Sequence, residues 1–231
     1  MKIVLLHGQN HKGSTYQIAR ILVDKIERKA EISEFFFPKD LNHFCNGCYQ
    51  CIQDESKCPF FEEKEQIMSA VAKADLLIFT TPTYCMHVSA PMKSFIDLTF
   101  TYWMSHRPRK SMFSKKTVIL STAAGMGTSS AIKDIRTCLT YWGISNVFSY
   151  GVSVQAMNWN GVSEKKKKQI NEAVGKLAKK VNKSTKHHTS IKTKGTFYLM
   201  RMMQKNNWGS GEEEKKYWQE NGWLDKARPW K

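Results

Sequence analysis

The chain has 231 residues, enough for one α/β domain whose core needs no disulfides, plus an additional segment. Its 36 Lys and Arg residues outnumber 20 Asp and Glu residues, which gives a formal net charge of +16 at pH 7, but the basic excess is concentrated between residues 164 and 205. A solvated helix face followed by a basic linker explains this distribution, so we expect neither nucleic acid nor an anionic membrane as a partner.

No apolar stretch approaches the ~20 residues of a membrane span, and no signal segment precedes the first predicted strand. We therefore expect a cytoplasmic protein. Its six cysteines are then metal ligands, redox groups or buried thiols rather than structural disulfides.

A glycine-containing turn, residues 7–15, joins the first predicted strand, residues 3–6, to a helix predicted over residues 16–29. Gly8 and Gly13 permit backbone angles closed to other residues, so that successive N–H groups can point into one hollow. Ser14 is the expected N-cap, which places the positive end of the helix at the same hollow. The turn predicts phosphate binding, with an ordinary capped βα turn as the alternative.

The spacing within this turn indicates which phosphate it suits. Ser14 stands where a nucleoside-triphosphate loop has its lysine, and the dinucleotide fingerprint needs a third glycine that is absent. A single terminal phosphate, held by backbone amides and the hydroxyls of Ser14 and Thr15, fits best.

Strands and helices alternate over residues 1–183. After the first helix we predict a strand (31–37), a cysteine-rich loop (40–61), a helix (62–73), an apolar strand (76–80), a loop (81–84), a helix (88–103), a strand (116–121), a glycine-bearing loop (122–128), a helix (129–142), a strand (146–154) and a helix (163–181). This order predicts an α/β fold with a doubly wound, five-stranded parallel sheet. The loops after the first, third and fourth strands then share the carboxyl edge, where such sheets bind ligands.

Four cysteines lie within one loop at spacings x2, x2 and x6: Cys45, Cys48, Cys51 and Cys58. Four thiolates at these spacings can converge on one centre, and cysteine-only ligation suits a 4Fe-4S cluster or a structural zinc. Metal-free packing or thiol redox chemistry is the third alternative. We expect the other two, Cys85 and Cys138, to be buried structural thiols.

Residues 184–231 lie outside a minimal domain of residues 1–183 and form a basic linker followed by a Trp-rich tail. The tail predicts a helix, a turn and a second helix that begins at residues 212–214, with acidic groups at its positive end. Its aromatic residues are expected to dock on the same domain or on a second subunit. A basic amphipathic membrane anchor is the alternative, which the acidic run interrupts.

Three stretches resemble the flavodoxin-like NAD(P)H-dependent FMN reductases, and within them the branch that contains the iron-sulfur flavoproteins. They are the turn at residues 8–15, the Thr81-Pro82-Thr83-Tyr84 stretch with the helix start at residues 89–97, and the four-cysteine loop. The resemblance covers residues 1 to about 183. It implies a flavodoxin-like sheet with strand order 2-1-3-4-5, here with a C-terminal helical extension.

The resemblance also implies FMN as the cofactor. The phosphate would be held by Gln9, His11, Gly13, Ser14 and Thr15, of which Gln9 and His11 stand where the family usually has Ser and Arg. The isoalloxazine would be lined by Pro82, Thr83 and Tyr84, and its other edge by residues 122–127, which include Ala124, Gly125 and Gly127.

An enzyme of this family takes a hydride from NADH or NADPH onto flavin N5 and passes electrons to an acceptor such as a quinone, a nitroaromatic, a free flavin or a protein. Because the flavin carries the hydride, the resemblance implies no catalytic side chain, and Tyr84 is expected only as a flavin or substrate contact. We expect a homo-oligomer, a dimer or a tetramer.

Two other functions remain open on the sequence. One is an iron-sulfur flavoprotein that acts as an electron carrier with little NAD(P)H turnover. The other is a flavodoxin-like binding module in which the cysteine loop holds zinc and the basic tail contacts nucleic acid.

Overall fold

The computed structural model describes residues 1–26, 29–184, 189–209 and 211–231. Parts of the predicted first helix (27–28) and of the basic linker (185–188) therefore lie outside the described residues.

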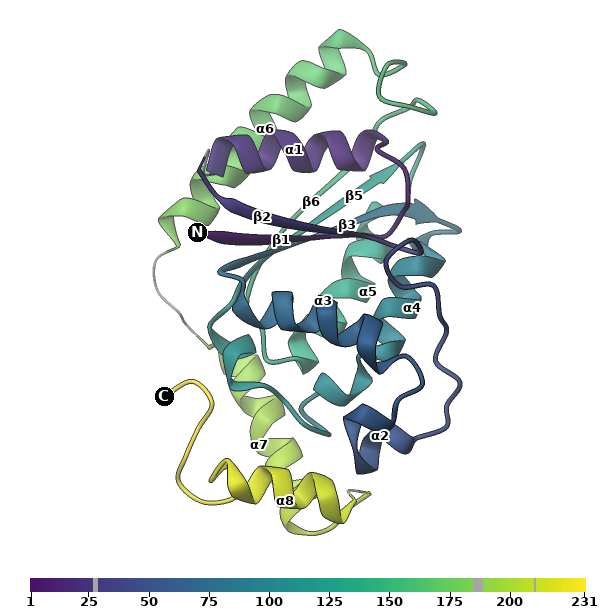
Figure 1. The fold of residues 1–231 in the computed structure, drawn as a ribbon. Helices are drawn as coiled ribbons and strands as arrows, with labels where there is room; N and C mark the ends of the chain where they lie inside the picture. The colour runs from purple at the N-terminus through teal and green to yellow at the C-terminus, as the bar shows by residue number, and fades with distance from the viewer. Residues whose placement is uncertain (27–28, 185–188, 210) are drawn as a thin grey trace.

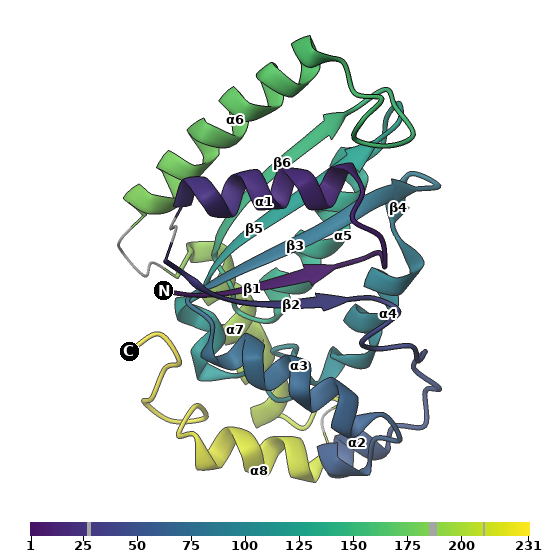
Figure 2. The ribbon, with the colours of Figure 1, turned by 45° about the horizontal axis from the view of Figure 1, so that its top comes forward.

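Five parallel strands form the central sheet, and their order confirms the predicted topology (Figure 1). The order is β2 (Glu31–Phe36), β1 (Lys2–His7), β3 (Leu76–Tyr84), β5 (Lys116–Ala123) and β6 (Asn146–Ser153). A sixth, two-residue strand, β4 (His87–Val88), pairs antiparallel with the end of β3. All five long strands end at the same edge, on the right in Figure 2.

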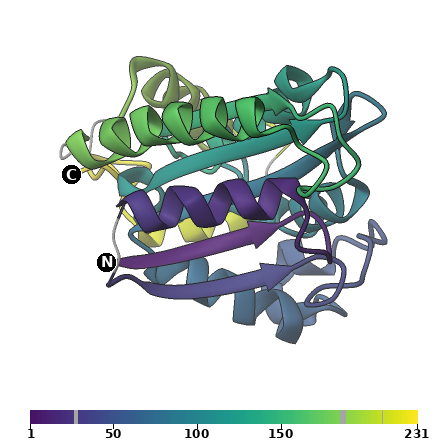
Figure 3. The ribbon, with the colours of Figure 1, turned by 90° about the horizontal axis from the view of Figure 1, so that it is seen from above.

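Helices cover both faces of the sheet. On one face α1 (Ser14–Ile26) and α6 (Glu164–Lys183) lie side by side (Figure 3). The other face carries α3 (Phe61–Lys73), α4 (Ala90–Leu98) and α5 (Thr128–Tyr141). Because side chains alternate along a strand, Leu5 of β1 packs in the α1–α6 core and its neighbour Leu6 in the opposite core.

Two predicted helices have different boundaries. The first helix begins at Ser14 itself, so the expected N-cap role of Ser14 is wrong. The helix predicted over 88–103 ends at Leu98, where the hydroxyl of Thr99 donates to the carbonyls of Phe95 (2.9 Å) and Ile96 (3.0 Å). A threonine hydroxyl that bonds to the preceding turn competes with continuation of the helix.

The predicted loop at residues 81–84 is also wrong, since β3 continues through Tyr84. The extension has partners on both sides, because Pro82 stands opposite Thr122 of β5 and Thr83 opposite Val88 of β4.

The remaining elements gather below the sheet in Figure 1. The cysteine loop contains α2 (Gln50–Gln53) and a 3-10 turn, η1 (Glu55–Lys57). Two further 3-10 turns are η2 (Phe100–Tyr102) and η3 (Lys110–Ser114). The tail forms α7 (Ile191–Lys205) and α8 (Glu212–Glu220). Figures 1 and 2 both show α8 beside α2. Among the described residues, no helix is both long and apolar enough to cross a membrane.

The tail packs on its own chain through a third apolar core. Phe197, Trp218 and Trp223 are buried there against Met104 and Phe113 of the main domain. The tail thus uses the first of the two docking modes expected from the sequence for these residues.

Candidate functional site

Three connections meet at the carboxyl edge of the sheet: the β1–α1 turn, the β3–β4 hairpin and the β5–α5 loop. Side-chain hydroxyls connect the three. Thr15 of α1 lies 2.6 Å from Thr122 at the end of β5, measured between the two Oγ1 atoms. Thr83 Oγ1 of β3 lies 3.0 Å from Ser121 Oγ of β5. The hydroxyl of Thr15, expected to contact phosphate, is therefore already engaged by a neighbouring strand.

Gly8 is required by space rather than by backbone angle. Neither Gly8 nor Gly13 has a positive φ, so the expectation of unusual backbone angles at these two positions is wrong. A Cβ on Gly8 would lie 2.6 Å from Ser89 Oγ and 2.9 Å from Met92 Cβ. The hydroxyl of Ser89 donates to the Gly8 carbonyl, and Gly8 N donates to the Thr80 carbonyl at 2.7 Å. The turn is therefore held tightly against β3 and the start of α4.

The mouth of this turn presents an unused donor. Gln9 is only 6% exposed, and its Nε2 has no hydrogen-bond acceptor among the described residues. A Cβ on Gly13 would lie 3.8 Å from Gln9 Nε2 and 2.9 Å from the imidazole of the exposed His11, so the three residues lie together. An unpaired buried N–H group is costly, and an anion at the positive end of α1 would satisfy it.

The β3–β4 hairpin has a two-residue turn, Cys85-Met86, with φ values of +48° and +70°. Turns of this type favour Asn-Gly, and each larger residue in the left-handed region costs about 1–3 kcal/mol. The expectation of a buried Cys85 is wrong, because this turn exposes the thiol. Tyr84 is 51% exposed beside the turn, whereas Pro82 is buried.

The β5–α5 loop lies against this hairpin. Gly127 has φ +97°, and a Cβ there would lie 2.8 Å from Thr83 Cγ2 and 3.1 Å from Met86 Cα. The preceding Ala124 and Gly125 are exposed, and the Ala124 carbonyl accepts a hydrogen bond from Ser153 Oγ of β6 at 2.8 Å. The structure therefore brings Gly127 of the second predicted segment against Thr83 of the first, whereas a Cβ on Gly125 would have no atom of the described residues within 4 Å.

His7 is a buried residue of this edge that the sequence analysis did not single out. Its Nδ1 lies 2.8 Å from Thr80 Oγ1, and its ring stacks on Phe36 with centroids 4.4 Å apart. Burial lowers the pKa of His7 to about 4, and the positive charges of Arg20 and Lys12 add to this effect. His7 is thus a neutral, buried side chain that packs beneath the turn. Its position at the end of an apolar strand is the feature of the sequence from which this burial could have been predicted.

A second site lies at the cysteine loop. All four cysteines line one cavity of about 380 Å³, whose walls also include Phe60 and Phe100. Cys51 is buried and Cys58 half-buried, whereas Cys45 and Cys48 are exposed. Burial raises the pKa of the Cys51 thiol.

The donor set of this cavity is that of a thiolate metal centre. In the arrangement of the described residues, however, no three His, Cys, Asp or Glu side chains converge closely enough to hold a metal ion. The four thiols therefore line the same cavity but do not converge on a single point in this arrangement.

Comparisons with known proteins identify relatives of this chain and structures that share its fold. The sequence pattern described as "NADPH-dependent FMN reductase" matches residues 1–158. An iron-sulfur flavoprotein of Methanocaldococcus jannaschii is 31% identical over 100 residues, which are 42% of this chain and 51% of that protein. An iron-sulfur flavoprotein of Archaeoglobus fulgidus is 26% identical over 148 residues, 62% of this chain and 64% of that protein. The chain thus spans about half to two thirds of the length of the curated relatives it matches.

Solved structures share the fold. An azoreductase from Bacillus anthracis superposes with a TM-score of 0.58, covering 79% of this chain and 99% of its own, at 14% identity. Because the family pattern matches residues 1–158, which include all three connections of the sheet edge and the cysteine loop, the chain belongs to the NADPH-dependent FMN reductase family.

Proposed function

We propose that this chain binds FMN at the carboxyl edge of its sheet and acts as an NAD(P)H-dependent flavin oxidoreductase with a small-molecule acceptor. The observation that carries the proposal is the unpaired, buried Nε2 of Gln9 within the β1–α1 turn. In a family of FMN reductases, the phosphate of FMN is the acceptor that this donor lacks.

Several groups of the turn favour a bound phosphate. The Gln9 amide donates a hydrogen bond, and the helix dipole of α1 adds a partial positive charge. The hydroxyl of Ser14, at the first position of α1, is a further donor beside the same hollow. His11, exposed at the mouth, is a third side-chain donor for the same anion.

Bound FMN supplies the hydride and electron-transfer chemistry itself. The protein's part is to hold the flavin ring, and we assign this to Pro82, Thr83 and Tyr84 of the hairpin together with the loop at residues 124–127. Helix α5 begins directly after this loop, so the positive end of its dipole would stabilise negative charge on a bound ring. No side-chain acid or base is required.

A second candidate function, an iron-sulfur flavoprotein that carries electrons, is favoured by the cysteine cavity. Helix α4 follows directly after the Ser89 that binds the Gly8 carbonyl, and Asp97 and Leu98 near its other end line the cavity. With nine residues this helix is about 13 Å long, so the two sites are near neighbours. Both curated relatives described above are named iron-sulfur flavoproteins.

The proposal is tested by titrating the metal-free protein with FMN and following the quenching of flavin fluorescence. Gln9→Glu replaces the donor by a carboxylate, and losing a hydrogen bond to a charged group costs about 1.5–3 kcal/mol, so the Kd should rise at least about tenfold. Gln66→Glu makes the same charge change at an exposed position of α3 and should leave the Kd within about twofold. Wild-type protein that does not bind FMN would overturn the proposal.

The absorption spectrum of protein purified without oxygen separates the functions. Flavin bands that NADPH or NADH bleaches support the reductase. A broad brown shoulder, with iron and sulfide at four of each per chain, supports the electron carrier. A colourless protein with bound zinc supports the binding module instead.

A further inference from the structure

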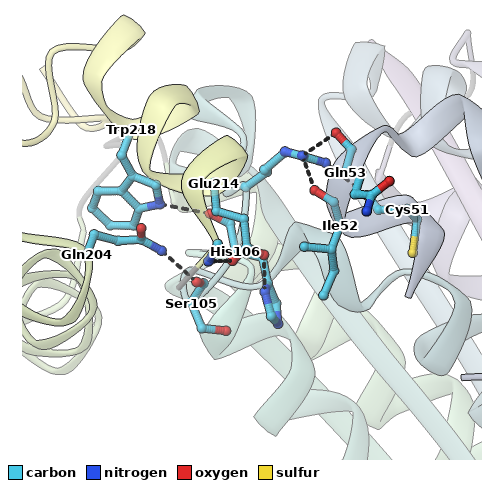
Figure 4. A network of polar contacts seen from close by, with 10 residues as sticks. Cys51, Ile52, Gln53, Ser105, His106, Gln204, Glu214 and Trp218 are labelled. Atoms are coloured by element: carbon cyan, nitrogen blue, oxygen red, sulfur yellow. Dashed lines mark hydrogen bonds and ion pairs between the residues drawn. The ribbon is translucent and has the colours of Figure 1, made fainter. Parts of the chain in front are cut away.

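The segment at residues 105–109 is held by the C-terminal tail. Gln204 of α7 donates from Nε2 to the Ser105 carbonyl at 2.9 Å, and Trp218 of α8 donates from Nε1 to the His106 carbonyl at 2.8 Å (Figure 4). Trp218 is fully buried. Two successive backbone carbonyls of the segment are therefore bound by side chains of the tail.

Two more contacts join this segment to α8. The hydroxyl of Tyr217 donates to the Pro108 carbonyl at 2.7 Å. The carboxylate of Glu214, which is 3% exposed, lies 2.5 Å from His106 Nδ1. With contacts at three of its five residues, the position of this segment depends on α7 and α8.

Arg107 of this segment in turn holds the cysteine loop. Its guanidinium, in a side chain that is 8% exposed, donates to the carbonyls of Cys51 (2.9 Å), Ile52 and Gln53 (3.1 Å). These three carbonyls belong to the last turn of α2, to which the helix itself supplies no backbone donor and at which a cation is favoured. Figure 4 shows this turn facing the His106–Glu214 pair.

Arg109 extends the contact toward the fourth cysteine. It pairs with Glu55 of η1, which lies between Cys51 and Cys58 in the sequence. Its guanidinium is 4.7 Å from the ring centroid of Tyr102 and 5.4 Å from that of Tyr217, a residue of the tail.

The exposed cysteines of the loop lie between two parts that are held in place. Near the start of the loop, Ser94 Oγ donates to the His43 carbonyl. Residues 51–55 are fixed by two arginines and contain a buried cysteine, whereas Cys45 and Cys48, between the two held parts, are exposed. A thiolate centre assembled in the cavity would thus start from a part of the loop that is already in position. Such supporting contacts typically change metal affinity by about 10–100-fold.

We propose that the C-terminal helix pair is a positioning element for the four-cysteine site, and that Arg107 is the residue through which it acts. The metal-binding part of this inference rests on the proposed iron-sulfur centre. The positioning of Cys51 is a property of the metal-free chain and is tested separately.

The first experiment measures the alkylation rate of each cysteine by iodoacetamide in the metal-free, full-length protein, using peptide mass spectrometry. Arg107→Met removes the charge and all three hydrogen bonds but keeps an unbranched, apolar stem, so alkylation of Cys51 should become at least about tenfold faster. The rates of the exposed Cys45 and Cys48 should stay within twofold. Trp218→Phe removes the indole donor of the tail and part of the buried ring but keeps an aromatic side chain. It should accelerate alkylation of Cys51 by a smaller factor without unfolding the chain.

The second experiment titrates the same proteins with Co²⁺ under anaerobic conditions and follows the thiolate-to-cobalt absorption. Arg107→Met should weaken cobalt binding by about 10–100-fold, as expected for the loss of a supporting contact. Arg107→Lys, which keeps the charge but not the planar fork of donors, should give an intermediate affinity. FMN affinity should stay within twofold of wild type in all variants.

Arg136→Met is the matched control. Arg136 of α5 also donates to a backbone carbonyl, that of Val147 of β6, at 3.3 Å. This hydrogen bond does not involve the cysteine loop. It should change neither Cys51 alkylation nor cobalt binding.

Unchanged Cys51 alkylation and cobalt affinity in both Arg107→Met and Trp218→Phe would overturn the positioning role. Wild-type protein that binds no cobalt would overturn the thiolate centre itself, and faster alkylation of Cys51 in the variants would still support positioning. The two failures are therefore distinguishable.

Discussion

The burial of His7 makes stability depend on pH. The pKa of His7 is lowered to about 4 in the folded chain, against an ordinary value near 6.5. Above pH 6.5 the imidazole is neutral in both states. As the pH falls from 6.5 toward 4, only the unfolded chain takes up the proton, so the free energy of unfolding should decrease by up to about 1.4 kcal/mol per pH unit.

Urea unfolding at pH 7 and pH 5 checks this expectation. The decrease attributable to His7 over this interval is about 2 kcal/mol, and it should be absent from His7→Gln. The exposed His11 provides the control, because His11→Gln should retain the wild-type dependence. A His7→Gln variant as sensitive to pH as wild type would show that the imidazole is not buried in neutral form.

Single residues were predicted with mixed success. The sequence placed Gln9, Gly13 and Ser14 in one turn because they are neighbours along the chain. The sequence did not reveal why Gly8 is a glycine, since Ser89 and Met92 approach it from a distant segment. Exposure of Cys85 was missed for a related reason: the turn that exposes it forms only because β4 pairs with β3.

The β5–α5 loop offers a matched pair of glycines for testing its packing on the hairpin. Gly127→Ala would place a Cβ in a left-handed residue, 2.8 Å from Thr83, and should lower the free energy of unfolding by about 1–2 kcal/mol or more. Gly125→Ala adds the same methyl group where no atom lies within 4 Å and should change it by less than about 0.5 kcal/mol.

Chemical denaturation and FMN titration of both variants provide the measurement. We expect Gly127→Ala also to weaken FMN binding, because the clash displaces the loop from residues 83 and 86. Equal stabilities for the two variants would contradict the close packing of loop and hairpin.

Elements with a strong apolar period were predicted well, and their ends less well. The apolar runs of β1 and β3 and the helical spacing of α5 depend on burial against the sheet, which the pattern records. The end of α4 depends instead on one hydroxyl, that of Thr99, which the apolar spacing through Trp103 conceals.

For the whole molecule, the tail is expected to contribute to global stability. Phe197 is fully buried among Phe113, Trp218 and Trp230, so Phe197→Ala should lower the free energy of unfolding by about 3–5 kcal/mol. Leu199→Ala, two residues further on the exposed side of α7, should cost less than about 1 kcal/mol. Urea midpoints compare the two, and equal values would mean that the tail does not pack as described.

The topology of the sheet could be predicted from the alternation of strands and helices. The contacts that join the C-terminal tail, residues 105–109 and the cysteine loop could not. The order of the sheet is constrained by right-handed crossovers. Nothing local in the sequence pairs Arg107 with the carbonyls of residues 51–53, or Glu214 with His106, because each of these side chains has several exposed alternatives until the fold brings one partner close.

The separation of His106 and Glu214 by 108 residues has a consequence for biosynthesis. A ribosome adding 5–20 residues per second needs roughly 5–20 s to travel that distance. During this interval the nascent cysteines have already emerged, yet the helices that steady Arg107 do not exist. If the four cysteines hold the proposed cluster, their full affinity for it is therefore reached only after α8 has been made, so that cluster assembly would follow translation.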